Sequence, residues 1–411
     1  MNQLNLADAR RVAIAESAVP HAITIEAARL FDGERLRRNW KIDIADGRII
    51  AAGPASSRAT GPIVHLAEDV MLAPGFIDTQ VNGGGGRLLN DAPSLESIAA
   101  IAQAHRRFGV TGLLPTLITD RQETLAQLAN VALTAARPPG VLGLHMEGPF
   151  ISTAKKGVHS PEYIRPIDTA SLQTLMALGK YGRSLVTIAP ELVAAADIRK
   201  LVSAGVRVSA GHSDATHAQM LMAIDAGLTG VTHLFNAMSQ MSARELGLVG
   251  TTFVDGRLIA GVICDGIHVH PLNLRTAFRL CGADRLMLVT DAMSTVGSDI
   301  RQFSLQGRPV ARDGDRLVAA DGTLAGAHLD MMAAVRNAVQ MMGVSLEDAL
   351  IMASRTPARF LGLGDELGRI KPGYRADLVA FSGDWSVVKT WIGGEEASHD
   401  GGEQMRARAR G

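Results

Sequence analysis

Eight apolar segments alternate with helical stretches between residues 76 and 291, and each segment ends in polar side chains. Strands that alternate with helices form parallel sheets, and eight such units predict a (β/α)8 TIM-like barrel. Active sites of these barrels lie at the carboxyl ends of the strands, so the polar ends are expected to converge on one site. These polar residues are Asp78, Gln80 and Asn82; Thr116 and Thr119; His145 and Glu147; Glu191; His212 and Asp214; His233 and Asn236; Asp265 and His268; and Asp291.

Both ends of the chain predict β structure of another kind. Residues 22–72 and 366–395 contain short strands separated by turn signals. Neither segment can bury a hydrophobic face alone, so we expect them to form one small β-sandwich domain beside a catalytic barrel of residues 73–365. The stretch 300–326 interrupts the rhythm after the eighth strand and predicts a β-rich insertion or lid.

The two termini and the bulk composition bound the remaining possibilities. Residues 1–21 are expected to form an N-terminal extension, and residues 396–411 a flexible tail. Lys+Arg and Asp+Glu both number 41 and aromatics are 4%, which argues against nucleic-acid and membrane partners. No apolar run reaches the ~18 residues of a membrane helix. Cys264 and Cys281 lack metal or redox spacing, so we expect reduced thiols in a cytoplasmic protein.

The most informative polar residues are a carboxylate and two imidazoles. Glu147, His212 and His233 end the third, fifth and sixth strands, and this donor set is a common catalytic zinc site. Asp291, on the eighth strand, could accept a proton from water at such a site. One histidine at a strand end is often only a hydrogen-bonded core residue. Four suitable residues at four strand ends favour a metal centre.

A series of motifs identifies a family that the chain resembles. In order along the chain they are LHMEGPF, KKGVH, SAGHSDAT, THLFNAM, CDGIHVHP, LVTDAM and GTLAGA. Over about residues 22–395 the chain is similar to the N-acetylglucosamine-6-phosphate deacetylases of the amidohydrolase superfamily. This resemblance implies a (β/α)8 barrel beside a β-sandwich, a homodimer, metal ligands at Glu147, His212 and His233, and Asp291 as catalytic residue. It also implies that His159 polarises the amide carbonyl.

The first strand departs from the pattern of many amidohydrolases. Gln80-Val81-Asn82 stands where those enzymes have His-x-His for a second metal. One branch of the deacetylases shares this Gln-x-Asn and works with one metal. The resemblance therefore implies one divalent ion per chain, with zinc preferred over iron, cobalt or manganese. Gln80 and Asn82 would support the site or line a vacant metal position, or would only satisfy buried hydrogen bonds. The glycines at 83–86 lack the Lys-Ser/Thr of a phosphate loop and are expected to allow a tight turn.

Substrate-binding residues follow from the resemblance. Arg244 and His268 match residues that hold a sugar phosphate, and one of them can come from a neighbouring subunit. Asn236 and Ala237 match positions that contact the phosphosugar, and Leu324 in GTLAGA belongs to the same group. His159 belongs to it as well, through its contact with the amide.

Three further histidines carry separate expectations. His328 follows Ala327 where the family usually has an apolar residue, so it could contact substrate or cap the next helix. His145 is expected to lie inside the barrel and His217 on a helix, neither as a ligand.

The function implied by the resemblance is hydrolysis of the acetamide of N-acetylglucosamine-6-phosphate to glucosamine-6-phosphate and acetate. The galactosamine epimer remains an alternative, because a hydroxyl orientation is read by contacts that the sequence does not show. A cyclic amidase or deaminase would usually need the missing His-x-His. A non-enzymatic scaffold should have lost a ligand or the base, yet all four residues are present.

Overall fold

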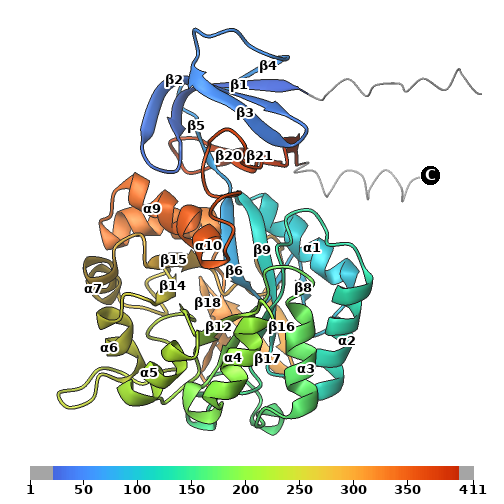
Figure 1. The fold of residues 1–411 in the computed structure, drawn as a ribbon, viewed down its shortest axis with the longest axis vertical. Helices are drawn as coiled ribbons and strands as arrows, with labels where there is room; N and C mark the ends of the chain where they lie inside the picture. The colour runs from blue at the N-terminus through green and yellow to red at the C-terminus, as the bar shows by residue number, and fades with distance from the viewer. Residues whose placement is uncertain (1–21, 398–411) are drawn as a thin grey trace, which may run out of the picture.

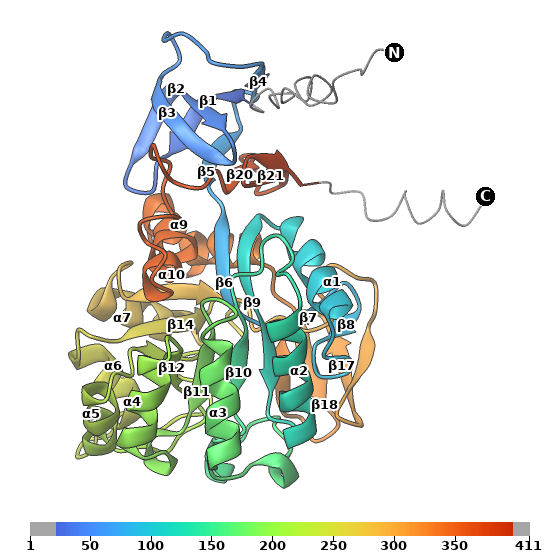
Figure 2. The same ribbon diagram turned by 45° about the vertical axis from the view of Figure 1, so that its right-hand side comes forward.

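The computed structural model describes residues 22–397 as two bodies, a barrel and a smaller β domain (Figure 1). The expectations for residues 1–21 and for most of the tail lie outside the described residues. The small domain contains both ends of the described chain, and the barrel is built from the sequence between them. Strand β6 continues directly from β5 of the small domain, so its carboxyl end points away from that domain (Figure 2).

Eight parallel strands form the barrel, as the alternating pattern predicts. They are paired in the order β15-β14-β13-β12-β11-β10-β9-β6. A bridge between Val81 and Ala292 joins the two outer strands, and the amide of Asp291 donates to the Gln80 carbonyl at 3.0 Å. The strands are β6 (Phe76–Val81), β9 (Val110–Ile118), β10 (His145–Glu147), β11 (Leu185–Ile188), β12 (Arg207–Ala210), β13 (Gly230–Val231), β14 (Ile259–Ile263) and β15 (Leu286–Val289).

Amphipathic helices surround these strands. Several begin at a side chain that accepts a hydrogen bond from the first turn: Ser94 caps α1, and Thr216 and Gln219 form a capping box at α5. The helices are α1 (Leu95–Arg106), α2 (Gln122–Thr134), α3 (Thr169–Leu178), α4 (Ala195–Ser203), α5 (His217–Asp225), α6 (Gly247–Val254), α7 (Pro271–Cys281), α8 (Met331–Asn337), α9 (Leu346–Ala353) and α10 (Arg355–Phe360), with a π-helical turn at Ala338–Met342.

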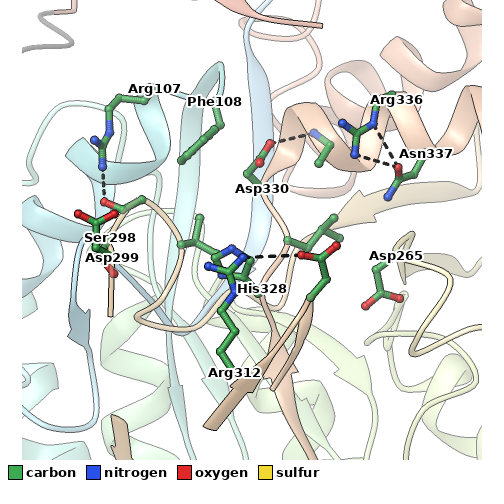
Figure 3. Close-up of a pocket in the computed structure, with 15 residues that line it drawn as sticks. Arg107, Phe108, Asp265, Ser298, Asp299, Arg312, His328, Asp330, Arg336 and Asn337 are labelled. Carbon is green, nitrogen blue, oxygen red and sulfur yellow. Dashed lines mark hydrogen bonds and ion pairs between the residues drawn. The ribbon is translucent and has the colours of Figure 1, made fainter. Parts of the chain in front are cut away.

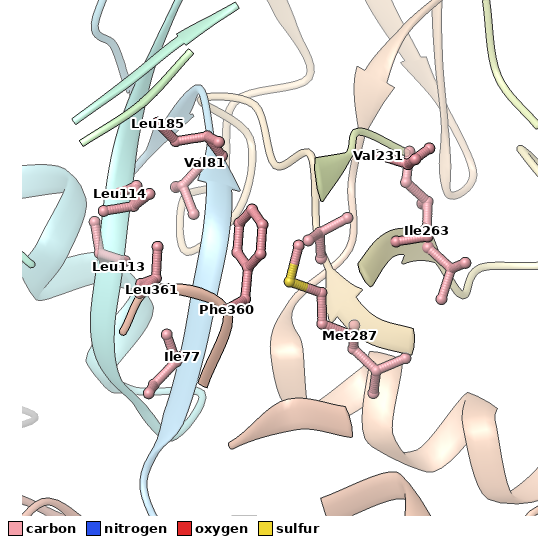
Figure 4. Packing of buried hydrophobic residues seen from close by; sticks show 14 of the residues in the cluster. Ile77, Val81, Leu113, Leu114, Leu185, Val231, Ile263, Met287, Phe360 and Leu361 are labelled. Carbon is pink, nitrogen blue, oxygen red and sulfur yellow. The ribbon is translucent and has the colours of Figure 1, made fainter. Parts of the chain in front are cut away.

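The apolar core of the barrel is continuous and extends to the last helix. Figure 4 shows Ile77 and Val81 of β6 near Leu113 and Leu114 of β9, with Phe360 beside them. A Cβ on Gly230 would lie 2.8 Å from the Phe360 ring, so α10 packs closely against β13. This packing fixes the strands whose carboxyl ends carry the polar residues.

The small domain forms one hydrogen-bonded sheet from both chain ends, as expected. Its order is β22-β21-β20-β5-β1-β2-β3, with β4 also paired to β1. Antiparallel pairing of β5 with β20 joins the two ends, and the shared core includes Leu72, Leu378 and Trp391. The strands are β1 (Ile23–Phe31), β2 (Leu36–Ala45), β3 (Arg48–Pro54), β4 (Ile63–His65), β5 (Met71–Pro74), β20 (Leu378–Phe381), β21 (Val387–Ile392) and β22 (Glu395–Glu396).

The predicted β-rich insertion is confirmed as a four-stranded antiparallel sheet. It lies at the end of the barrel away from the small domain (Figures 1 and 2). Its side chains Leu305, Val310 and Leu317 form a separate core with Ile118 and Met293 of the barrel. The strands are β16 (Gln302–Leu305), β17 (Arg308–Asp313), β18 (Arg316–Ala319) and β19 (Leu324–Ala327).

The glycine run at residues 83–86 makes a short hairpin after β6, between β7 (Gly83–Gly84) and β8 (Arg87–Leu88). A Cβ on Gly83 would lie 2.4 Å from the Arg87 carbonyl oxygen and 2.8 Å from the Ser294 nitrogen. Gly85 and Gly86 have φ of +60° and +82°, which favours glycine. The run therefore permits a tight turn against the loop that follows β15.

Among the residues that the structure describes, none of the helices has the length and apolar character needed to cross a membrane.

Candidate active site

Unusual backbone conformations mark the carboxyl ends of the strands that carry the predicted site. His212, His233 and Asp291 have φ of +49°, +31° and +51°, in the left-handed region that most side chains avoid. Ala237 has φ of +48°. Such conformations cost on the order of 1–3 kcal/mol each and cluster at functional sites. The fold therefore holds these side chains in directions that regular strand geometry would not give.

Glu147, His212 and His233 converge on one point inside the barrel. Oε1 of Glu147 lies 3.2 Å from Nε2 of His212 and 2.9 Å from Nε2 of His233. The two Nε2 atoms are 3.0 Å apart. All three residues are at least 95% buried. Three donor atoms from β10 and from the loops after β12 and β13 thus face one small volume.

The hydrogen bonds of His212 indicate that a cation fits this volume. Its Nδ1 contacts the Lys155 carbonyl oxygen at 2.9 Å, and because that oxygen can only accept, Nδ1 carries the hydrogen. In the neutral ring Nε2 then has a lone pair, which faces a carboxylate oxygen of Glu147. Two acceptors at this distance need a proton or a metal ion between them. A carboxylate with two imidazoles is a suitable donor set for a divalent transition metal.

Burial and charge oppose each other at Glu147. Burial disfavours the ionised carboxylate, but the contacts with the rings of His212 and His233 hold the pKa of Glu147 well below its usual range. The pKa of His233 shifts in the opposite direction. Burial disfavours its cationic form, yet the hydrogen bond to Glu147 raises the pKa of His233. Glu147 is therefore an anionic oxygen donor in the protein interior.

Asp291 lies beside this cluster and is held by two amides. Its Oδ1 accepts from Nδ2 of Asn82 at 2.6 Å and from Nε2 of Gln80 at 3.1 Å. Nε2 of Gln80 also donates to Oε1 of Glu147 at 3.0 Å. Burial and the charge of Glu147 raise the pKa of Asp291 to about 6. The amides therefore direct their N–H groups at the two carboxylates.

His159 packs beside His212 in the cluster. Its ring centre is 4.2 Å from that of His212, and its Nδ1 contacts Oγ1 of Thr119 at 2.8 Å. A ring nitrogen of His159 also lies within 4.8 Å of donor atoms of Glu147 and His212. His233 approaches both of those donors more closely, so it is the better third ligand. Burial, reinforced by the charge of His212, lowers the pKa of His159 well below its usual range, so the ring is a neutral hydrogen-bond donor or acceptor.

A cavity of about 250 Å³ opens onto these residues and includes most of the expected substrate positions. His268 and Asn236 line it together with Ala237. Leu324 of the insertion contributes another wall, beside Met293. Glu147, Asp291 and His268 thus face the same cavity.

Arg244 does not line this cavity. It lies exposed in the loop before α6, outside the wall formed by its own chain. Glu245 next to it folds back and accepts hydrogen bonds from the amides of His217 and Gly247 at 2.8 and 2.9 Å.

One expectation from the sequence needs correction, and one of two alternatives is excluded. Asp78 does not line the cavity; it is fully buried, and Oγ1 of Thr290 donates to it at 2.6 Å. The pairing register between β6 and β9 shifts between Asp78 and Val81, which breaks the simple alternation of side chains. His328 does not cap α8, because Asp330 accepts from the Ala333 amide at 2.8 Å and takes that role.

The other histidines lie as expected. His145 is fully buried, with Nε2 2.7 Å from Oγ1 of Thr187, and burial lowers its pKa to about 4. His217 begins α5, and its Nδ1 contacts Oγ1 of Thr251 at 2.9 Å. Neither belongs to the convergent cluster.

A larger hollow of about 500 Å³ lies nearby, between α1, α8 and the insertion. Figure 3 shows Arg107, Arg312 and Arg336 at its edge, with His328 in the middle. Glu147, His212, His233 and Asp291 do not line it. Asp265 does, and its carboxylate also contacts His268 of the smaller cavity. The smaller cavity therefore has the reactive groups, although it is not the larger of the two.

The sequence predicts the main cluster but not the residues that hold its side chains in place. Thr119 and Asp265 were recognisable only as polar strand ends, and the structure shows them bonded to His159 and His268. Thr290, which binds Asp78, precedes Asp291 directly. In the sequence these residues are marked only by lying at a strand end or next to a candidate site residue. That position does not specify which side chain each of them contacts.

Comparison with known proteins places this geometry in a family. The amidohydrolase family profile matches residues 71–397. An N-acetylgalactosamine-6-phosphate deacetylase from Shewanella sp. (strain ANA-3) is 41% identical over 90% of this chain and 94% of its own length. An N-acetylglucosamine-6-phosphate deacetylase from Haemophilus influenzae is 35% identical over 86% of this chain and 93% of its own.

Solved structures agree with the fold. The N-acetylglucosamine-6-phosphate deacetylase from Pasteurella multocida superposes with a TM-score of 0.87 at 34% identity, covering 91% of this chain and 99% of that one. A mutant enzyme of the same name from Mycobacterium smegmatis, in complex with N-acetyl-D-glucosamine-6-phosphate, gives 0.85 at 33% identity, over 92% and 99%.

Proposed function

This chain belongs to the amidohydrolase family, and from that premise we propose that it hydrolyses the acetamide of an N-acetylhexosamine 6-phosphate, with the glucosamine compound as the first candidate. The products are acetate and the amino-sugar phosphate. The observation that carries the proposal is the convergence of Glu147, His212 and His233 beside Asp291, in one cavity with His268. Curated relatives named as deacetylases of such sugars cover most of the chain.

One divalent ion, for which zinc is the first candidate, would be held by Glu147, His212 and His233. Bound there, the ion supplies Lewis-acid activation of water and of the acetamide carbonyl. Gln80 and Asn82 favour a single ion, because their amide nitrogens face carboxylate oxygens and amide oxygens are weak ligands.

Proton transfer is assigned to Asp291. In the ionised state it accepts a proton from the attacking water, and the oxygen of that water bonds to the carbonyl carbon. The C–N bond then breaks, and Asp291 returns the proton to the leaving amine. Its position suits this role, since Oδ1 is occupied by Asn82 and Gln80 and Oδ2 stays available.

Stabilisation of the carbonyl oxygen is assigned to His159. Its Nδ1 is engaged by Thr119, which leaves Nε2 for the substrate. A neutral ring can donate one hydrogen bond there to the oxygen that gains charge during attack. His268 would hold the phosphate, with Asn236, Ala237 and Leu324 around the sugar.

We also propose a homodimer, in which Arg244 serves the site of a partner subunit. Its exposed position outside the cavity of its own chain supports this assignment. Arginine presents a planar pair of donors that suits phosphate oxygens. A cytoplasmic location fits a sugar-phosphate substrate.

The galactosamine epimer is the second candidate substrate. It is favoured by the relatives from Shewanella and Escherichia coli, which are named as N-acetylgalactosamine-6-phosphate deacetylases and are 41% and 38% identical to this chain. The Haemophilus relative named for the glucosamine compound is 35% identical. Sequence identities that differ by so little do not decide which of the two sugar epimers is the substrate.

The test is acetate release from both 6-phosphates and from unphosphorylated N-acetylglucosamine. We expect rapid release from at least one phosphate ester, little from the unphosphorylated sugar, and loss of activity with a chelator that zinc reverses. Equal rates with and without phosphate would reject the phosphate assignment. Absence of release from all three by the zinc-loaded protein would reject the reaction.

A further inference from the structure

Asp265 lies two residues beyond the end of β14, between the reactive cavity and the larger hollow. Its Oδ2 lies 2.6 Å from Nδ1 of His268. Its Oδ1 accepts from the amides of Ile267 and His268, each at 2.8 Å. The two side chains are 7% and 8% exposed. One carboxylate thus shapes the turn and orients the ring.

The turn that carries this pair is fixed on its other side by α8. Nδ2 of Asn337 donates to the carbonyl of Cys264 at 2.9 Å. Gly266, inside the turn, has φ of +71°. Figure 3 shows Asp265 at the edge of the larger hollow, below Asn337. The backbone leaves Asp265 little freedom to move away from His268.

We propose that Asp265 is a positioning residue for substrate, which holds the His268 ring in the orientation that binds the phosphate. The proposal rests on the proposed function, because it needs His268 to face a phosphate. It assigns to Asp265 no contact with the reacting atoms.

The chemistry follows from the two ring nitrogens. Nδ1 donates to the carboxylate, so Nε2 is the nitrogen left for the cavity. Burial disfavours the ionised form of Asp265, but hydrogen bonds from the His268 ring and from the His268 and Ile267 amides hold its pKa below the usual range. An anionic carboxylate therefore fixes the ring with Nε2 toward the cavity, where an N–H donates to phosphate oxygen.

The substitution Asp265→Asn isolates this effect. The amide oxygen can keep the hydrogen bonds from the Ile267 and His268 amides, while the negative charge beside Nδ1 is lost. Asp299→Asn is the matched control, because Asp299 is an exposed carboxylate on the wall of the larger hollow and does not contact His268.

The experiment measures two quantities on the zinc-loaded wild type, Asp265→Asn, Asp299→Asn and His268→Gln. They are steady-state acetate release from the preferred 6-phosphate, and calorimetric binding of inorganic phosphate. For Asp265→Asn we expect KM and the phosphate Kd to rise about tenfold with kcat within about twofold. Asp299→Asn should match wild type. In the His268→Gln background, Asp265→Asn should add no further loss.

The possible outcomes distinguish the positioning role of Asp265 from the proposed deacetylase reaction. Unchanged KM and Kd in Asp265→Asn overturn the positioning role while the deacetylase function stands. A fall in kcat alone, or an equal loss in the His268→Gln background, also overturns it. If wild type binds inorganic phosphate through Asp265 and His268 but releases no acetate, the proposed reaction fails and the positioning role stands. Wild type without phosphate binding overturns the positioning role.

Discussion

The left-handed backbone at His212, His233 and Asp291 is the clearest mark of function at the level of single residues. Strain of this kind persists only where the surrounding structure fixes it. Here backbone hydrogen bonds hold the strained residues. The amide of Asp291 donates to the Gln80 carbonyl, and the carbonyl of His212 accepts from the Ser152 amide at 2.8 Å. The backbone therefore fixes the directions of these three side chains.

Loss of one ligand should remove the ion. We expect His233→Gln to lower metal affinity by more than the roughly 10–100-fold that loss of an outer partner costs, because a neutral amide replaces a strong donor. His217→Gln is the control, since His217 is on α5 and outside the cluster. Elemental analysis after dialysis measures metal per chain. Equal metal in the two variants would show that His233 is not a ligand.

Asp78 should make stability depend on pH. Burial raises its pKa to about 7, above its value of 3.8 in the unfolded chain. Between these values the native state holds a proton that the unfolded state releases, so stability falls as pH rises from about 4 to 7. Asp78→Asn should lessen that fall by up to about 1.4 kcal/mol per pH unit. Urea unfolding at several pH values measures this slope, and identical slopes would contradict the assignment.

At the level of elements, the insertion supports the site as well as covering it. Its β16–β17 turn contacts two barrel segments: Nε2 of Gln306 donates to the Thr119 carbonyl at 2.6 Å, and Arg308 donates to the Val158 carbonyl. Thr119 and Val158 are the neighbours that position His159. The insertion is thus joined to the residue assigned to the carbonyl oxygen.

Breaking this contact should slow the reaction without removing the metal. We expect Arg308→Ala to reduce kcat by roughly tenfold, about 1.4 kcal/mol in activation free energy, because the His159 loop loses its anchor. Arg316→Ala, an exposed position on β18, is the control. Steady-state kinetics with metal analysis of both variants makes the comparison. A normal kcat in Arg308→Ala would show that the insertion does not position His159.

The sequence could predict elements better than side-chain directions. Eight strand ends were recognisable because apolar runs closed with polar groups, and the four-stranded insertion because it broke that rhythm. The sequence does not place Asp78 correctly, because the alternation of polar and apolar residues does not reveal the register shift between β6 and β9. Hydrogen bonds such as Asp265 to His268 depend on the turn geometry, which spacing alone does not give.

At the level of the whole molecule, the site joins strands that are distant in sequence. Glu147, His212 and His233 come from three of the eight barrel units and Asp291 from a fourth, so an ion held by the first three would link separate parts of the barrel. Ligands that bind only the native state stabilise it, by about 4 kcal/mol at 1,000 times Kd. The unliganded barrel must instead hold a carboxylate and two imidazoles in close contact.

Removal of the ion should therefore lower Tm. We expect a chelator to lower the unfolding temperature of the wild type by several degrees, and added zinc to restore it. Glu147→Gln should respond little to either treatment, because its site lacks the anionic ligand. Differential scanning calorimetry at fixed protein concentration measures both. Identical unfolding temperatures of the wild type with and without chelator would contradict a tightly bound ion that stabilises the native barrel.

We propose that Asp291 moves the proton at a metal site built by Glu147, His212 and His233. The most direct measurement is acetate release and metal content of Asp291→Asn beside wild type, on the preferred 6-phosphate. We expect about one ion per chain in both proteins and at least a roughly thousandfold lower kcat in the variant. Substantial residual turnover with the metal retained would contradict the role given to Asp291.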